Sequence, residues 1–305
     1  SVAAVSKVLR NAYGVSDALR EKVEASIAKF GYRPSVAARG MRGQTFTLGV
    51  LLVGIDNPFL PGIYRGIESV TEAAGYKIMV GVGAARTPTE VRLIEQMIDN
   101  RMDGLILVAT QIAGETLEHC ALQIPIVVIG HHEPLAVGYD TINNDDREGA
   151  RMAVRALLAQ GYRDIAMITL ADPGDHPADV APQRERGYLD VMTGAGLAGH
   201  ARVTRLPQSD APRDEVIEQF LTSPDRPRAV FCWSDLDAIP LIDAAFRLGV
   251  RVPEDLAIVG YDNSPIASLS MIDLSSVDQD ALQLGRLSAE ALFSRIAGRE
   301  AARHI

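Results

Sequence analysis

The sequence predicts an α/β protein built from two similar doubly wound parallel-sheet subdomains, preceded by a small all-α segment. Short, almost uniformly apolar runs alternate with amphipathic stretches of helical period from residue 46 onward. Such runs are typical of parallel strands that helices cover on both faces. About ten strands exceed one comfortable sheet, so we expect two sheets, with a ligand site in the cleft between them.

The individual elements follow from these two periodicities. We expect strands in residues 46–53, 76–82, 103–109, 124–130, 164–170, 201–206, 228–233 and 256–261. We expect helices in residues 62–75, 88–100, 146–161, 183–196, 214–223 and 235–249.

The N-terminal segment reads as short helices. Ser1 is the expected N-cap of residues 2–10, and Ser16 that of residues 17–30, which Gly31 ends. A third short helix, residues 36–41, is weakened by its glycine and should fold only with a partner.

Charge is distributed unevenly along the chain. The formal net charge is −9, yet residues 1–44 contain eight bases and three acids. A basic arm on an acidic body favours a polyanionic partner for the arm, although a solvated helix face explains the charge alone equally well.

Composition predicts a soluble, cytoplasmic protein. The two cysteines, Cys120 and Cys232, form no metal-ligand pattern and are expected to be reduced and buried. No apolar run is long enough to cross a bilayer, and charges interrupt the N-terminus too often for a signal peptide.

No motif argues for catalysis, a cofactor or a metal. Residues 81–86 form half of a dinucleotide fingerprint but lack its third glycine. His131 and His132 have no third ligand in register, and no nucleophile elbow or phosphate-binding loop is present. We therefore expect a protein that is not an enzyme.

Polar residues gather where the apolar strands end. Residues 54–59, 142–149, 231–237 and 259–265 each place Asn, Asp or Ser there, which suits a polyhydroxylated ligand covered by an aromatic ring. For each of these polar residues taken alone, the alternative to ligand binding is that it only caps the helix that follows.

These segments together resemble the LacI/GalR family of bacterial sugar-responsive repressors. The segments "SVAAVSKVLRN", "DNPF", "MDGLIL", "RAVFCWSDLDAI" and "VPEDLAIVGYDNSP" occur in the family's order and spacing. The resemblance implies a partial helix-turn-helix in residues 1–34 and a hinge in 35–46. It also implies a periplasmic-binding-protein-like core, with residues 47–144 and 279–305 in one subdomain and 145–278 in the other.

The resemblance further implies a homodimer on palindromic operator DNA. The residues that it places on DNA are Val2, Ala3, Ser6, Lys7, Arg10, Arg39, Met41 and Arg42. Lys7 would read guanine, and Met41 would wedge into the minor groove and kink the duplex. The family's first DNA-binding helix is absent from the sequence. We therefore expect a trimmed or partly ordered chain.

For a sugar-like effector, the resemblance implies a second set of residues. These are Asn57, Phe59, His131, Asp145, Arg184, Ser234, Asp262 and Gln279. Leu60 stands where many relatives have an aromatic residue, so the sugar is not predicted. The alternatives are a solute-binding protein for a sugar transporter and a sugar-acting α/β enzyme.

Overall fold

The computed structural model describes residues 2–9, 13–31, 43–171, 179–207 and 210–305. The side chains of Val2, Ala3, Ser6, Leu9, Asp210 and Ala211 lie outside this description. The described chain divides into two compact units, Ser1–Thr45 and Phe46–Ile305.

The described part of the first unit contains two of the three predicted helices, and the third, residues 36–41, lies outside the described residues. Helix α1 spans Val2–Leu9 and helix α2 spans Asp17–Phe30. Val8 and Val23 are buried, so each helix contributes an apolar side chain to this small unit. Gly31 ends α2 in the left-handed conformation at φ 57°, as expected of a C-terminal glycine.

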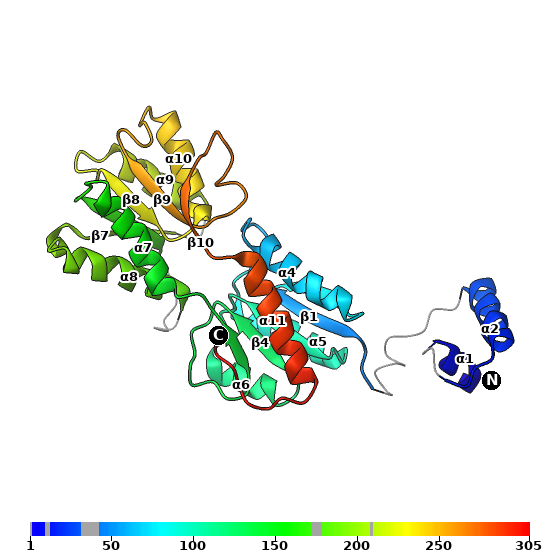
Figure 1. Cartoon of the computed structure of the whole chain (residues 1–305). Helices are drawn as coiled ribbons and strands as arrows, with labels where there is room; N and C mark the ends of the chain where they lie inside the picture. The colour runs from blue at the N-terminus through cyan, green and yellow to red at the C-terminus, as the bar shows by residue number, and fades with distance from the viewer. Residues whose placement is uncertain (1, 10–12, 32–42, 172–178, 208–209) are drawn as a thin grey trace. The chain divides into compact units, whose positions relative to one another are not determined.

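The second unit contains two five-stranded sheets in which every pairing is parallel. The first sheet has the order β2-β1-β3-β4-β5 and the second β10-β9-β8-β6-β7 (Figure 1). The strands of the first are β1 (Thr47–Leu52), β2 (Lys77–Val82), β3 (Gly104–Val108), β4 (Ile126–Ile129) and β5 (Asp140–Ile142). Those of the second are β6 (Ile165–Leu170), β7 (Arg202–Leu206), β8 (Ala229–Cys232), β9 (Ala257–Asp262) and β10 (Ser275–Asp278).

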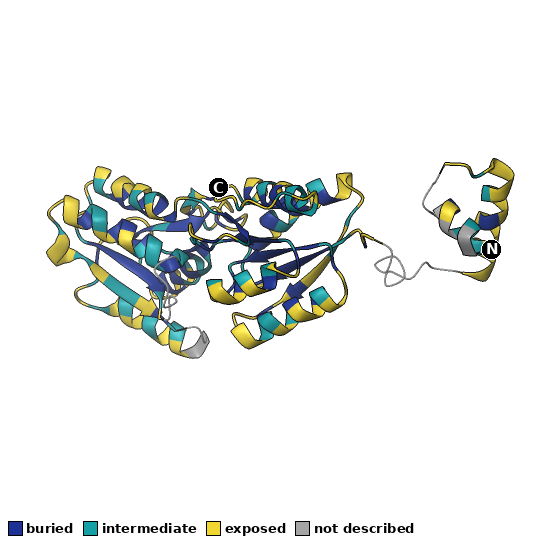
Figure 2. Ribbon diagram, turned by 90° about the horizontal axis from the view of Figure 1, so that it is seen from below, coloured by how far each residue is buried: buried dark blue, intermediate teal, exposed yellow. Residues whose placement is uncertain are grey.

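Helices cover both faces of each sheet. Around the first sheet lie α4 (Leu60–Ala73), α5 (Thr87–Asp99), α6 (Gly114–Ala121) and α11 (Ala281–Ile296). Around the second lie α7 (Asp146–Ala159), α8 (Val180–Gly194), α9 (Asp210–Thr222), α10 (Asp235–Arg247) and the 3₁₀ turn η1 (Ala198–His200). Each sheet has two apolar clusters, one per face, which explains why its strands are apolar throughout. Figure 2 shows these buried strands and the exposed outer surfaces of the helices.

The predicted α/β architecture of two parallel sheets is confirmed. Four elements, α6, β5, β10 and α11, were not delineated from the sequence. The two strands among them are only three and four residues long, too short to show a period. The chain passes between the sheets at residues 143–145 and again at 279–280. The division into subdomains at residues 144 and 278 stays a prediction, which this strand membership supports.

Candidate functional site

A pocket lies between the carboxyl ends of the strands of the two sheets. Its cavity volume is about 140 Å³, below the range of about 300–1,000 Å³ usual for small-molecule sites. Its lining comprises Val53, Asn57, Phe59, Leu60, Ile63, Val108, Ala109, Ile129, Gly130, Ile142, Asn143, Asn144, Asp146, Val180, Arg184, Trp233, Ser234, Asp262, Gln279 and Leu284. This position is the one that open α/β sheets use for ligands.

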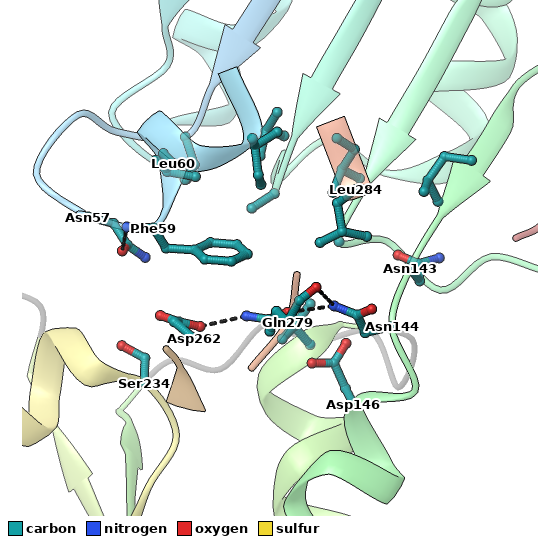
Figure 3. Close-up of a pocket in the computed structure, with 18 of the residues that line it drawn as sticks. Asn57, Phe59, Leu60, Asn143, Asn144, Asp146, Ser234, Asp262, Gln279 and Leu284 are labelled. Carbon is teal, nitrogen blue, oxygen red and sulfur yellow. Dashed lines mark hydrogen bonds between the residues drawn. The ribbon is translucent and has the colours of Figure 1, made fainter. Parts of the chain in front are cut away.

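The loop after β1 brings an aromatic ring into the pocket. Oδ1 of Asn57 accepts a hydrogen bond from the backbone N–H of Phe59 at 2.9 Å, which fixes the turn that opens α4. Phe59 is buried and extends across the pocket above Asp262 and Gln279 (Figure 3). Its face is available to cover one side of a ligand.

The two crossovers are hydrogen-bonded to each other. Nδ2 of Asn144 donates to the backbone carbonyl of Gln279 at 2.8 Å and lies 3.3 Å from its Oε1. The side chain of Asn143 pairs with the backbone of His131, accepting at 2.9 Å and donating at 3.0 Å. These amides therefore anchor the strands that connect the two halves.

A buried ion pair forms the floor of the pocket. Nε of Arg184 donates to Oδ1 of Asp146 at 2.8 Å, and Nε2 of His132 lies 2.7 Å from Oδ2 of the same carboxylate. Burial opposes the charge of Asp146, but Arg184 and His132 outweigh it and hold the pKa of Asp146 below its usual value. The ring of Tyr261 lies 3.6 Å from the guanidinium carbon of Arg184, adding a cation–π contact.

Two glycines allow this pair to form. A Cβ at Gly187 on α8 would come within 2.3 Å of the carbonyl oxygen of Arg147 on α7. A Cβ at Gly149 would come within 2.1 Å of the hydroxyl of Tyr261. Gly187 therefore lets α8 approach α7, and Gly149 leaves room beside α7 for Tyr261 of β9.

Asp262 at the end of β9 has an unused acceptor. Its Oδ1 accepts from Nε2 of Gln279 at 2.5 Å, whereas its buried Oδ2 has no hydrogen-bond partner in the described part of the chain. Burial raises the pKa of Asp262 to about 7, although Arg184, 3.7 Å away, opposes the rise. Its backbone has φ 116°, a conformation that costs about 1–3 kcal/mol and persists mainly at functional sites.

Ser234 and Trp233 lie between β8 and α10. Oγ of Ser234 accepts from the N–H of Leu236 at 3.0 Å and caps α10. Trp233 also lines the pocket, and its carbonyl accepts from Arg184 at 2.6 Å. Neighbouring residues of a strand face opposite ways, but β8 ends at Cys232, so this alternation does not prevent Trp233 and Ser234 from both lining the pocket.

Comparison with known proteins identifies the family. Residues 1–35 match the model of bacterial regulatory proteins of the lacI family, and residues 154–305 match a periplasmic binding protein-like domain. The chain is 30% identical over 298 residues to the ribose operon repressor of Haemophilus influenzae, which covers 97% of this chain and 88% of that protein. The chain belongs to the LacI family.

Further LacI-family proteins agree in sequence and fold. The transcriptional repressor PurR of Erwinia tasmaniensis is 30% identical over 302 residues, 97% of this chain and 87% of that protein. The solved complex of the regulator CelR with cellobiose superimposes with a TM-score of 0.72 at 26% identity, over 98% of this chain and 91% of that one. These relatives are regulators rather than enzymes.

Six of the eight residues predicted for the effector of this LacI-family protein line the pocket. They are Asn57, Phe59, Arg184, Ser234, Asp262 and Gln279. Two do not. Asp145 caps α7, accepting from the N–H of Glu148 at 2.9 Å, and the next residue, Asp146, takes the place in the pocket. His131 is buried outside the lining, with its ring 6.3 Å from that of Tyr139.

Asn143, Asn144 and Asp146 are the polar lining residues that the sequence did not single out. All three belong to the same polar run, residues 142–149, that the sequence placed at a strand end. The signal was therefore present, but which residue of the run faces the pocket depends on where β5 ends and α7 begins.

Most of the predicted DNA-binding residues lie outside the described side chains. Lys7 is described and lies exposed on α1, where a major-groove contact would need it. Val2, Ala3 and Ser6 belong to α1, but their side chains are not described. Arg10, Arg39, Met41 and Arg42 lie outside the described residues.

Within the described ranges, no group of three or more His, Cys, Asp or Glu side chains could hold a metal ion. No helix in the same ranges combines the length and apolar character that crossing a membrane requires.

Proposed function

We propose that this LacI-family protein is a cytoplasmic, homodimeric transcriptional repressor whose affinity for operator DNA is controlled by a small hydroxylated effector in the pocket. The observation that carries the effector half is the carboxylate of Asp262, which lines the cavity between the two sheets and has one buried oxygen without a hydrogen-bond partner among the described residues. A buried acceptor without a partner favours a ligand that donates to it.

The ligand would act by bridging the two halves of the core. Phe59 and Asn57 contact it from the first sheet, and Arg184, Ser234 and Asp262 from the second. A ligand that contacts both halves binds one relative orientation better than others and shifts the equilibrium by that difference in affinity. The hydrogen-bonded crossovers at Asn144 and Gln279 are the natural pivot.

The DNA half of the proposal rests on the basic N-terminal arm. Lys7 reads a base edge, Ser6 and Arg10 contact phosphates, and Met41 wedges between base pairs with Arg39 and Arg42 on the backbone. A dimer follows, because two recognition helices about one helical turn apart match a palindromic operator. No enzymatic step is required of any of these residues.

The test is selection of duplexes by the full-length protein from a random pool at moderate salt, with and without mixed sugars. We expect a palindrome with a flexible central step and an affinity that falls steeply with salt. A folded, dimeric protein that enriches no sequence under either condition overturns the proposal and favours a solute-binding protein. Turnover of a bound ligand would favour an enzyme.

A further inference from the structure

A second cavity lies at the opposite end of the second sheet from the inter-sheet pocket. It has a volume of about 310 Å³, within the range usual for small-molecule sites. Ala166 and Arg202 line it where β6 and β7 begin, whereas the inter-sheet pocket lies where the strands end. The two linings, as described, share no residue. This cavity is therefore a separate candidate for a ligand.

Polar residues at the start of β7 form one side of the second cavity. Alternate residues of a strand face the same side, so Arg202 and Thr204 share a face with Leu206, which belongs to an apolar cluster with Ile217 of α9. Apolar side chains of a helix cannot cover such polar groups without depriving them of water, which explains the hollow. Helix α9 forms the opposite side through one of its faces, residues 216, 219 and 220.

Two guanidinium groups line the second cavity, and they differ in their partners. Arg202 donates through Nη1 to the backbone carbonyl of Asp225 at 2.6 Å and through Nη2 to the carboxylate of Asp164, which balances its charge. Arg226 donates through Nη1 to the backbone carbonyl of Leu221 at 2.6 Å. No carboxylate of the described residues forms an ion pair with Arg226. Its Nε and Nη2 therefore remain available.

The groups that remain available indicate an organic monocarboxylate. Nε and Nη2 of Arg226 form a fork that matches the two oxygens of a carboxylate. The side-chain amide of Gln219, which has no hydrogen-bond partner in the described part of the chain, offers a further donor. Phe220 and Val216 provide apolar surface for the rest of the ligand. A phosphate dianion would bring a second negative charge beside Asp225 without a second unpaired cation to meet it.

Helix α9 connects the second cavity to the inter-sheet pocket. Nearer the start of this helix, Arg213 forms an ion pair with the buried Asp237 of α10. The other carboxylate oxygen of Asp237 accepts from the indole N–H of Trp233, which lines the inter-sheet pocket. A ligand that draws α9 towards β7 would therefore act on Trp233 through these contacts.

We propose that the cavity between α9 and β7 is a second ligand site. It binds a small monocarboxylate with an apolar body on Arg226, and it is coupled to the inter-sheet pocket through Arg213 and Asp237. The inference goes beyond the proposed function, because it concerns a ligand other than the effector and does not require the operator.

Calorimetric titration of the full-length protein with phenylacetate tests the site. Phenylacetamide is the uncharged control of nearly the same shape, and it should bind about tenfold or more weakly, because charge-assisted hydrogen bonds are about twice as strong as neutral ones. Phenyl phosphate should also bind more weakly than phenylacetate. Arg226→Gln should weaken phenylacetate binding by about tenfold and change phenylacetamide binding by less than about threefold.

Two further variants make the test specific. The matched control is Arg228→Gln, since Arg228 is exposed in the same loop but does not line the cavity, and it should bind phenylacetate like the unaltered protein. Gln219→Glu places a carboxylate in the cavity at an exposed helix position and should weaken phenylacetate binding by about tenfold. It tests the site independently if Arg226→Gln does not fold.

The chain carries its own probe for the coupling. Trp233 is the single tryptophan and lines the inter-sheet pocket, so its fluorescence reports on that pocket. Phenylacetate should change Trp233 emission with the midpoint found by calorimetry, and Gln219→Glu should shift both midpoints together. Trp233→Phe controls for signal from other residues.

The outcomes separate the site from the coupling. The site is overturned if phenylacetate does not bind, if phenylacetamide or phenyl phosphate binds as tightly, or if Arg226→Gln and Gln219→Glu leave phenylacetate binding unchanged. It is also overturned if the change in Trp233 emission persists with the same midpoint in both variants, because the ligand then lies in the inter-sheet pocket. Phenylacetate binding without any change in Trp233 emission overturns the coupling.

Discussion

Asp262 combines the features expected of a ligand-binding residue at a cost to stability. It is a buried carboxyl with a positive φ and one unpartnered oxygen. Because burial raises its pKa to about 7, its ionisation is favoured in the unfolded chain and penalised in the folded one. The penalty is absent below pH 4, grows between about pH 4 and 7, and is constant above.

Asp262→Asn should remove the penalty and, with Oδ1 still accepting from Gln279, replace the acceptor Oδ2 by an NH₂ donor. Between pH 5 and 8 the unaltered protein should lose roughly 1–3 kcal/mol of unfolding free energy at this site, and the variant should not. Denaturant melts at both pH values measure this difference. Effector response should be abolished in the variant, and an intact response would show that the ligand does not use Asp262.

Arg184 and Asp146 form a pair in which each charge depends on the other. Arg184→Met should lower the free energy of unfolding by about 3–5 kcal/mol, because it leaves Asp146 buried with only His132. Adding Asp146→Asn should recover part of that loss. A double-mutant cycle in denaturant measures the coupling, and additive losses would contradict a direct pair.

For single residues, the sequence predicted the pocket lining correctly where a polar residue directly follows a predicted strand. Asp262, Ser234 and Asn57 follow recognisable strand ends, and all three line the pocket. The sequence analysis placed Asp145 rather than Asp146 in the pocket. Both residues follow β5, and only the position at which α7 begins decides which one caps the helix and which one lines the pocket. The apolar residues of the pocket lining could not be predicted, because a leucine that lines a pocket and a leucine of the core occur in the same sequence pattern.

At the scale of elements, close helix contacts set the shape of the pocket. Helices α4 and α11 cross at glycines: a Cβ at Gly285 would lie 2.1 Å from the carbonyl oxygen of Ile63, and one at Gly66 would lie 2.2 Å from that of Leu282. Ile63 and Leu284 line the pocket. The crossing therefore positions apolar side chains of the lining.

Gly285→Ala should force α4 and α11 apart and cost about 1–3 kcal/mol of unfolding free energy. The control is Gly194→Ala at the end of α8, where nothing lies within 4 Å of the added methyl group. Equal melting temperatures for the two variants would contradict the close crossing.

Most strands and helices were placed well because their periodicity is strong, but the helices α6 and α11 were not delineated. The short β5 and β10 were not found, since three or four residues carry no period. Their positions depend on pairing with β4 and β9, which the sequence does not show locally.

At the scale of the whole molecule, the basic arm and the acidic core have separate tasks. Residues 1–44 carry the excess of bases, whereas the core contains the pocket. When only one of the two ligands is present, changes in one unit should therefore alter binding to that unit and leave binding to the other intact.

Met41→Ala should weaken binding to the selected operator by about tenfold or more, because it removes the side chain that we propose as the wedge between two base pairs. The affinity of the pocket for its ligand should not change. Fluorescence anisotropy with labelled operator measures the first, and Trp233 fluorescence the second. Equal operator affinity for both proteins would remove Met41 from that role.

The most direct test of the account is the affinity for the selected operator, measured with and without a ligand that Trp233 reports as bound. Coupling between the two sites predicts a change of about 5–150-fold on saturation, and no change in Asp262→Asn. The same operator affinity at full ligand occupancy would contradict effector control of this repressor.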